Sequence, residues 1–203
     1  MTHFKPLRRR YFAVRHGQSE ANVEKIIVSD PEVGCIRYGL TEEGQKQAVL
    51  AADHLRRILP SASKVQIHTS DFLRTLQTAA VIASKFPDAT IHPTPLLRER
   101  RFGEFEGQAD TCYRVVWEED AKGPKAQLGP GVEDTAHVRD RGMTVIKQLE
   151  EHGETEVVIL VGHGDTLQIL QTAFEGLEAW QHRSLALLQT AEVRELVVRS
   201  AAN

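Results

Sequence analysis

The chain has 203 residues, of which 41% are hydrophobic, and it carries a formal net charge of -3 at pH 7. A chain of this size buries enough apolar surface to fold as one globular domain without disulfides. The mild acidity argues against nucleic acid as the main partner, and no apolar run approaches the ~20 residues of a membrane-spanning helix. Cys35 and Cys112 have no paired spacing, which excludes a cysteine-based metal cluster and favours a reducing, cytoplasmic compartment.

The basic N-terminus, MTHFKPLRRR, lacks the apolar core of a signal peptide. We interpret Arg8, Arg9 and Arg10 as a solvated leader, with substrate or surface binding as the alternative.

The first half of the chain alternates apolar strands with amphipathic helices. A strand at 12–14 precedes a helix that Thr41 caps. The apolar face of this helix comprises Ala48, Ala51, Ala52, Leu55 and Leu59. A strand at 64–68 precedes a helix that starts at Ser70 or Asp71. The residues expected to face inward on it are Phe72, Leu76, Ala79, Ala80, Ala83 and Phe86. A weaker strand follows at 90–92.

The second half repeats this alternation after an irregular stretch. Glycine and proline block regular structure at 123–131, and we interpret 108–131 as a lid or surface excursion. A helix follows Asp134 and Thr135, with an apolar face made of Val138, Gly142, Val145, Ile146 and Leu149. A strand at 156–161 leads into a helix near Asp165 that carries Leu167, Leu170 and Phe174, and a last strand is expected at 193–198.

This alternation predicts an α/β fold, a three-layer sandwich with a mostly parallel central sheet flanked by helices. Residues 108–131 could instead link two domains, but we judge the flank on each side too small for that and expect a single domain over 1–203.

Titratable residues occur at corresponding places after four of these strands. Arg15 and His16 follow the first strand, Arg74 lies in the first turn after the second, Glu99 follows the third and His163 the fourth. Because ligands bind at the carboxyl ends of strands in open α/β sheets, these groups should converge on one crevice. Two arginines, two histidines and a carboxylate suit a tetrahedral phosphate.

Each residue type has a chemical reason. Arginine presents a fork of donors to phosphate oxygens, and the backbones of Gly17 and Gly164 add donors. One histidine, neutral near pH 7, serves as a nucleophile toward phosphorus. Glu99 supplies a proton to the leaving alkoxide if burial raises its pKa. A surface ion-pair cluster with its neighbouring arginines is the alternative for Glu99, and capping of the last helix is the simpler interpretation of Asp165.

The segment VRHGQSEAN at 14–22 resembles the signature of the histidine phosphatase superfamily, in its phosphoglycerate-mutase-like branch. Four further segments resemble other motifs of this family in the expected order: LTEEG at 40–44, TSDFLRTLQTA at 69–79, LRERRFGEFEG at 97–107 and VGHG at 161–164. The resemblance extends from residue 11 to about residue 170. Gly39, Phe105 and GVED at 131–134 depart from common family residues, which leaves local substrate contacts open.

The resemblance implies a role for each matching residue. His16 is the nucleophile that becomes phosphohistidine, Glu99 is the proton donor, and Arg15, Arg74 and His163 complete the phosphate pocket. Asn22 and Gln18 line its edge. The resemblance implies neither a metal nor an organic cofactor.

It also predicts a phosphoric monoester hydrolase of the histidine phosphatase type. The segment between Glu99 and His163 is shorter than in family mutases, which favours a phosphatase on a small phosphorylated metabolite; a phosphomutase is the alternative, and an inactive phosphate-binding scaffold a further one. The basic residues Arg37, Arg100, Arg101, Arg114, Lys122 and Lys125 either surround the pocket or are solvated lid charges. The oligomeric state cannot be derived from the sequence.

Overall fold

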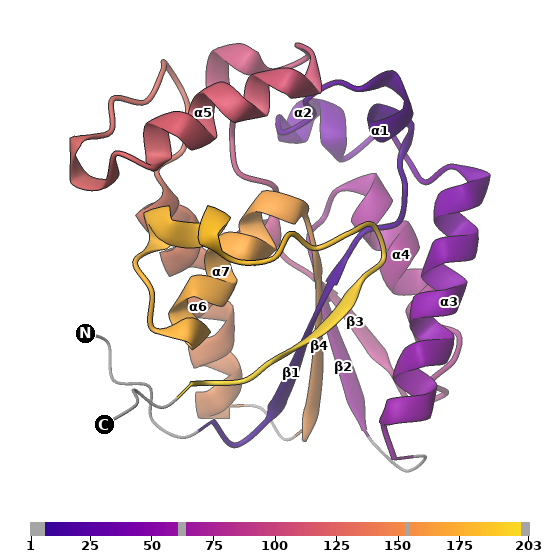
Figure 1. The fold of residues 1–203 in the computed structure, drawn as a ribbon. Coiled ribbons are helices and arrows are strands. Elements are labelled where there is room, and N and C mark those ends of the chain that lie inside the picture. Colours follow the sequence, from indigo (N-terminus) through magenta and orange to yellow (C-terminus); the bar gives the residue numbers. More distant parts are fainter. Residues whose placement is uncertain (1–6, 61–63, 153–154, 200–203) are drawn as a thin grey trace.

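The computed structural model describes residues 7–60, 64–152 and 155–199. Its centre is a five-stranded sheet with strand order β3-β2-β4-β1-β5 (Figure 1). The strands are β1 (Arg10–Arg15), β2 (Val65–Thr69), β3 (Thr90–Pro93), β4 (Val157–Gly162) and β5 (Val193–Leu196). The first four are mutually parallel and β5 pairs with β1 antiparallel. The predicted mostly parallel sheet and its five strands are confirmed.

The register of the sheet brings together the residues that follow the ends of β1, β2 and β4. Arg15 at the end of β1 pairs with Gly162 on β4, and Thr69 at the end of β2 pairs with Val161. The next residues, His16, Ser70 and His163, therefore leave the sheet side by side at its carboxyl edge.

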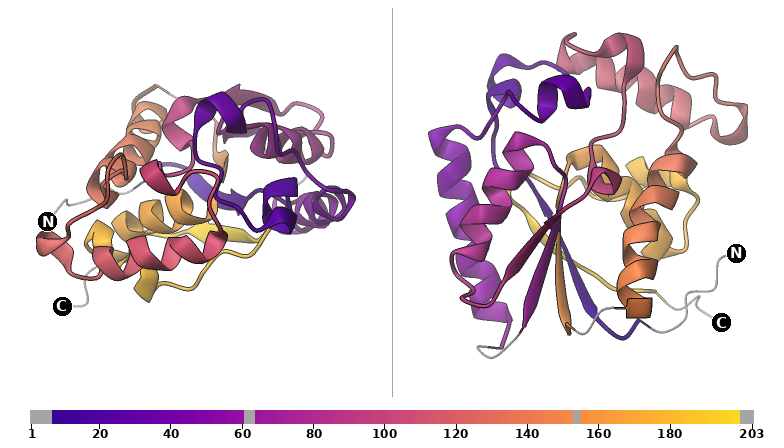
Figure 2. Two further views of the ribbon diagram at one scale, coloured as in Figure 1. Left: turned by 90° about the horizontal axis from the view of Figure 1, so that it is seen from above. Right: turned by 180° about the vertical axis from the view of Figure 1, so that it is seen from behind.

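Helices cover both faces of the sheet (Figures 1 and 2). Helices α3 (Glu42–Ile58) and α4 (Leu73–Ala83) lie on one face, and α6 (Thr135–His152) and α7 (Gly164–Glu175) lie on the other. Each face has its own apolar core, because residues alternate across the strands. Phe12 and Ile159 belong to the first core and Tyr11 and Leu160 to the second. The predicted three-layer arrangement is confirmed.

The predicted apolar faces are confirmed for α3, α6 and α7, but only partly for α4. The side chain of Thr41 accepts a hydrogen bond from the Gly44 amide and caps α3, as expected. Helix α4 starts after Phe72 rather than at Ser70 or Asp71, and Ala80, expected inside, is exposed. Its buried residues are Arg74, Thr75, Thr78, Ala79 and Ile82.

Short elements gather over the carboxyl edge of the sheet, at the upper end of Figure 1. They include α1 (Glu20–Glu24), α2 (Pro31–Gly34) and α5 (Tyr113–Asp120). The 3-10 turns are η1 (Pro95–Leu97), η2 (Gly103–Phe105), η3 (Asp110–Cys112), η4 (Gly123–Lys125) and η5 (Ala179–Ser184). The stretch 108–131 thus contains a helix and packs through Val116 against Ile27 and Phe102. Its role as a lid stays a prediction.

The interpretation of the arginines at 8–10 as a solvated leader holds for Arg8, whose side chain is 68% exposed, but is wrong for Arg9 and Arg10. Arg10 begins β1 and donates to Glu195, and the side chain of Arg9 is only 6% exposed, with its Nη1 3.4 Å from Glu150. Residues 1–6 of the basic segment lie outside the described residues.

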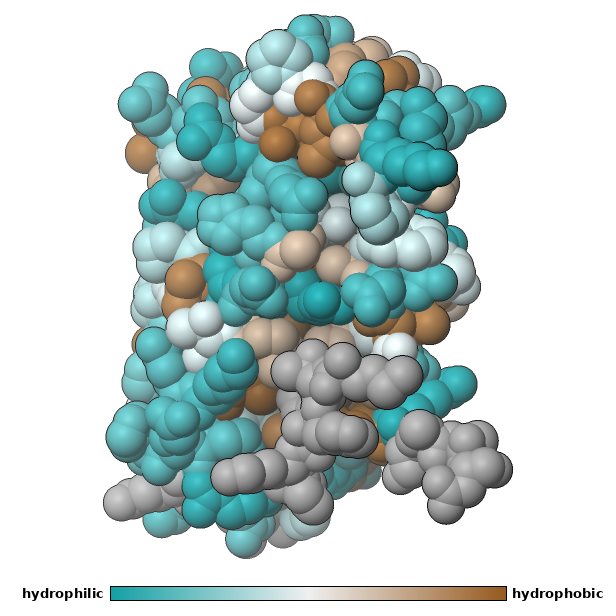
Figure 3. Space-filling view, turned by 90° about the vertical axis from the view of Figure 1, so that its left-hand side faces the viewer, coloured by the Kyte–Doolittle hydropathy of each residue, from teal (hydrophilic) through white to brown (hydrophobic). Residues whose placement is uncertain are grey.

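The surface is mostly hydrophilic on the face in Figure 3, where hydrophobic residues form small separate patches. Large exposed hydrophobic residues such as Ile36, Leu50 and Val197 come from different parts of the fold. Within the described ranges, no helix combines the length and the apolar composition needed to span a bilayer.

Candidate active site

A pocket of about 190 Å³ lies at the carboxyl edge of the sheet. Predicted site residues that line it are Arg15, His16, Asn22, Arg74, Glu99 and Gly164. The pocket also has walls that the sequence did not predict, among them Asp110, Tyr113, Trp117, Asp165, Arg183 and Leu187. The convergence expected from the strand ends is thus present.

His16 is buried and held in one tautomer. Its Nδ1 lies 2.7 Å from the carbonyl oxygen of Gly17, which can only accept, so Nδ1 carries the proton. The other nitrogen, Nε2, accepts a hydrogen bond from Arg74 Nε at 3.2 Å. Burial, together with the charges of Arg74 and Arg15, lowers the pKa of His16 well below that of an ordinary histidine. The imidazole is therefore neutral at pH 7, with the lone pair of Nε2 in the pocket.

The loop after His16 is fixed by a close backbone approach. A Cβ on Gly17 would lie 2.3 Å from the carbonyl oxygen of Gly44, and a Cβ on Gly44 only 1.9 Å from that of Gln18. Glycine is required at both positions because any side chain would push the two segments apart. Ser19 and Asn22 then form a capping box that starts α1. These contacts hold the segment that carries His16 against α3.

His163 lies opposite Arg74 and close to His16, with the two ring centroids 5.3 Å apart. Its Nδ1 accepts from Arg74 Nε and Nη2 at 3.2 and 3.0 Å, so Nε2 carries the proton and donates to Ser70 Oγ at 2.9 Å. Burial and the charge of Arg74 lower its pKa well below the ordinary range. His163 is thus a neutral partner that orients Arg74.

Arg74 and Arg15 supply positive charge without a carboxylate partner. Arg74 Nη2 donates to the Val28 carbonyl at 2.9 Å, and Arg15 Nη1 to the Leu188 carbonyl at 2.8 Å. Arg74 Nη1 and Arg15 Nε are buried and have no hydrogen-bond partner among the described residues. Burial lowers the pKa of both, but a guanidinium stays charged at neutral pH. A buried and a half-buried cation, each with a spare buried donor, form an anion site.

The Arg15 guanidinium lies so close to Gly164 that it favours glycine at this position. A Cβ at this position would lie 3.3 Å from Arg15 Cζ and Nε, so a side chain there would crowd the guanidinium. Gly164 begins α7, and its amide is one of the unpaired donors of a helix start.

Glu99 is a buried carboxyl group, only 7% exposed, and not part of a surface ion-pair cluster. Its Oε1 accepts from the amides of Arg100 and Thr166 at 2.9 and 3.2 Å. The adjacent arginine, Arg98, pairs with Asp71 instead. Burial raises the pKa of Glu99, and the charge of Asp165 raises it further. The pKa of Glu99 is thus shifted upward, which is the direction that a proton donor near neutral pH requires.

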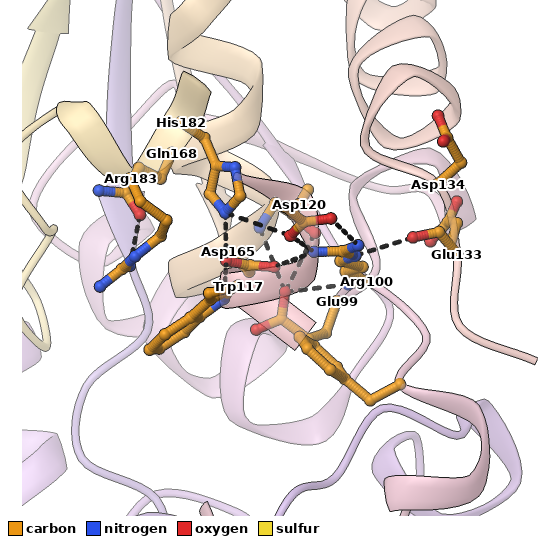
Figure 4. Close-up of polar contacts among 12 residues, drawn as sticks. Glu99, Arg100, Trp117, Asp120, Glu133, Asp134, Asp165, Gln168, His182 and Arg183 are labelled. Atoms are coloured by element: carbon orange, nitrogen blue, oxygen red, sulfur yellow. Dashed lines mark hydrogen bonds and ion pairs between the residues drawn. The ribbon is translucent and has the colours of Figure 1, made fainter. Parts of the chain in front are cut away.

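Asp165 does not cap α7, contrary to the simpler interpretation, since His163 occupies the N-cap position. Its Oδ1 accepts from Trp117 Nε1 at 2.9 Å and lies 3.3 Å from His182 Nε2, and its Oδ2 accepts from Arg100 at 3.2 Å (Figure 4). Burial alone would raise the pKa of Asp165, but His182 and Arg100 hold it below its ordinary range. The carboxylate is therefore a fixed negative charge beside Glu99.

Arg100 is neither a pocket cation nor a solvated lid charge. It is fully buried and forms a two-pronged pair with Asp120 of α5 at 2.6 and 2.8 Å (Figure 4). The other basic residues proposed around the pocket are exposed and do not line it: Arg37, Arg101, Arg114, Lys122 and Lys125.

The structure does not bring Gln18 to the pocket. Its Oε1 accepts from Thr41 Oγ1 at 2.9 Å, which ties the loop to the start of α3. Ser70 was missed, although it follows β2 at the position where His16 follows β1. Trp117 and Arg183 carry no motif or periodicity that would have revealed them.

The family model described as the histidine phosphatase superfamily (branch 1) matches residues 11–202. The agropine synthesis reductase of Rhizobium rhizogenes is 30% identical over 173 residues, which cover 83% of this chain and 35% of the reductase. This chain thus spans about a third of that relative.

Two further similarities cover most of both proteins. The 2,3-bisphosphoglycerate-dependent phosphoglycerate mutase of Bartonella henselae is 28% identical over 184 residues, 85% of this chain and 84% of the mutase. A mycobacterial glucosyl-3-phosphoglycerate phosphatase, solved in complex with VO3, aligns with a TM-score of 0.75 and 24% identity over 92% of each chain. The structural similarity establishes the fold.

Proposed function

The chain belongs to the histidine phosphatase superfamily (branch 1), and we propose that it is a phosphomonoesterase that acts on a small phosphorylated metabolite through a phosphohistidine at His16. The observation that carries this proposal is the unprotonated Nε2 of His16, which shares a pocket with the guanidinium groups of Arg15 and Arg74. A nucleophile without a proton beside two cations that lack carboxylate partners suits a phosphoryl group.

In the first half-reaction, the Nε2 lone pair of His16 forms a bond to phosphorus while the bond from phosphorus to the ester oxygen breaks. Glu99 gives its proton to that oxygen, which leaves as an alcohol. Arg15 and Arg74 stabilise the charge on the phosphoryl oxygens. Asn22 and the amide of Gly164 contribute at the edge of the pocket.

In the second half-reaction, water attacks the phosphorus of phosphohistidine. The Glu99 carboxylate accepts a proton from this water, the bond from phosphorus to Nε2 breaks, and its electrons return to the imidazole. Phosphate leaves and Glu99 is again protonated, so the cycle closes without a cofactor. Asp165 supports this exchange because its fixed charge disfavours a second carboxylate beside it.

We prefer a phosphatase to a phosphomutase because the segment between Glu99 and His163, which contains α5, is short. Residues 108–131 supply Tyr113 and Trp117 to the pocket wall, which supports a role for this stretch as a lid over a small substrate. The phosphomutase stays the alternative, since the first half-reaction is common to both, and an inactive scaffold is less favoured because all five groups are retained.

We further propose that the protein is a single domain with a cytoplasmic location. A single domain over 1–203 is supported by the packing of the described elements around one sheet. The free cysteines Cys35 and Cys112 support a cytoplasmic location. That nucleic acid is not a partner stays a prediction.

The test compares the wild type with His16→Ala on p-nitrophenyl phosphate and a panel of phosphorylated metabolites. His137→Ala is the matched control, because its side chain is 73% exposed on α6. We expect His16→Ala to abolish both turnover and the acid-labile phosphoryl adduct, and His137→Ala and the wild type to retain both. Absence of turnover of every phosphomonoester by the wild type would contradict the proposal. Transfer to 3-phosphoglycerate that outpaces hydrolysis, with its bisphosphate as primer, would establish the mutase instead.

A further inference from the structure

Arg183 is a pocket cation that phosphoryl transfer at His16 does not use. It lies in η5, after α7, and lines the same pocket as His16 and Glu99. Unlike Arg15 and Arg74 it is exposed, so its guanidinium lies where the pocket meets solvent. Its position is that of a group that meets the remainder of a substrate rather than the transferred phosphoryl group.

The guanidinium of Arg183 is held in place despite its exposure. Its Cζ lies 3.8 Å from the centroid of the Trp117 ring, and its Nη1 donates to Gln168 Oε1 at 2.7 Å (Figure 4). Gln168 is buried in α7. A surface arginine normally loses side-chain entropy when it binds a ligand, but these two contacts remove most of that freedom beforehand.

Trp117 is itself fixed by the buried polar network. Its ring stacks on Tyr113 at 5.4 Å with an interplanar angle of 9°, and its Nε1 donates to Asp165. Asp165 is in turn bound to Arg100, which pairs with Asp120. Helix α5 thus presents a rigid aromatic surface, and the Arg183 guanidinium lies over its Trp117 ring.

The charge of Arg183 is not neutralised by the carboxylates that line the pocket. Asp165 is engaged by Arg100 and His182, and Glu99 has a raised pKa. Asp110 also lines the pocket, but in the described part of the chain it forms no ion pair with Arg183. The planar fork of Arg183 therefore retains Nε and Nη2 as donors for an anion.

We propose that Arg183 binds a second acidic group of the substrate and makes the enzyme selective for phosphomonoesters that carry one. This inference rests on the proposed phosphomonoesterase function and adds to it the class of substrate. The pocket of about 190 Å³ restricts that class to small metabolites. The second group is a carboxylate or a second phosphate, since a guanidinium fork binds either.

The experiment uses two matched substrate pairs with the full-length protein. In the first pair, 3-phosphoglycerate is compared with glycerol 3-phosphate, and in the second, fructose 1,6-bisphosphate with fructose 6-phosphate. The readout is the ratio of kcat/KM for the more acidic member to that for the less acidic member. We expect the wild type to prefer the acidic member of at least one pair, and Arg183→Gln to lower that ratio roughly tenfold, mainly through KM. The pair affected identifies the carboxylate or the phosphate.

Two further variants separate the charge from other effects. Arg183→Lys keeps the charge but not the flat fork, and should retain part of the preference. Arg114→Gln removes an exposed cation of α5 that pairs with Glu118 and does not line the pocket, so it should leave the ratio unchanged. An equal ratio in the wild type and Arg183→Gln, or no preference in either pair, would overturn the inference while hydrolysis itself persists. Absence of all hydrolysis in the wild type would instead refute the underlying function.

Discussion

Arg100→Met is expected to have a large effect on the free energy of unfolding. The guanidinium of Arg100 is fully buried and makes four hydrogen bonds: two to Asp120, one to Asp165 and one from Nε to the Glu133 carbonyl at 2.8 Å. Methionine has a similar length and fills much of the same space, so packing is largely preserved. The substitution therefore tests the charge.

The expected loss follows from what Arg100→Met leaves behind. Asp120 and Asp165 would remain buried without a guanidinium partner, with His182 Nε2 at 3.9 and 3.3 Å and the Trp117 indole N–H on Asp165. Breaking a buried ion pair from one side costs about 3–5 kcal/mol, a large share of the ~5–15 kcal/mol that stabilise a typical domain. Unpaired burial raises the pKa of a carboxyl group, so protonation relieves part of the cost. The deficit should be smaller at pH 5 than at pH 7.

Urea unfolding followed by circular dichroism measures this loss at both pH values. The double variant Arg100→Met with Asp120→Asn removes one of the stranded charges and should be more stable than Arg100→Met alone. A loss below about 1 kcal/mol, or no gain from the second substitution, would show that water or local rearrangement solvates these carboxylates and would refute the reasoning.

Two further predictions concern Glu99 and His16. Glu99→Gln should lower kcat for alkyl phosphates roughly 10²- to 10⁴-fold, but far less for p-nitrophenyl phosphate, because its leaving group needs no proton. The variant should also lack the fall in activity that occurs in the wild type as rising pH deprotonates Glu99. Equal losses on both substrates would contradict the acid role. The pKa of His16 is lowered in the folded state, so below its unfolded value of 6.5 the unfolded chain binds more protons and stability falls as pH falls. His16→Asn should reduce this loss between pH 7 and pH 5.5 by about 1 kcal/mol, measured by urea unfolding, and an unchanged loss would mean that His16 is protonated in the folded protein.

Hydropathy periodicity predicted the inner faces of α3, α6 and α7 because those helices face apolar core. Helix α4 departs from the rule because its inner face serves the site. Thr75 Oγ1 donates to the Ser70 carbonyl, and Thr78 Oγ1 accepts from the Gly17 amide, so these polar residues are satisfied inside. Ala80 is displaced to the surface as a consequence. Periodicity fails where a helix carries buried polar residues for a binding site.

The convergence of His16, Arg74 and His163 was predictable because parallel strands fix where their carboxyl ends meet. The partners of those residues were not. Asp165 was assigned to a cap because its place at a helix start permits one, whereas Arg100 and His182, 65 and 17 positions away along the chain, attract it elsewhere. Such pairings depend on long-range packing of α5 and η5, for which a single sequence carries no pattern.

Two buried arginines of this protein have different surroundings. This difference distinguishes an arginine that stabilises the fold from one that binds an anion. Arg100 is matched by Asp120 and Asp165, so its charge is balanced within the fold. Arg74 is equally buried, yet its partners are neutral histidines and a carbonyl, and one nitrogen has no partner among the described residues. Burying an unmatched cation destabilises the fold, and an anion with several oxygens would relieve that cost on binding. The placement of carboxylates around each arginine, rather than arginine itself, therefore marks the phosphate site.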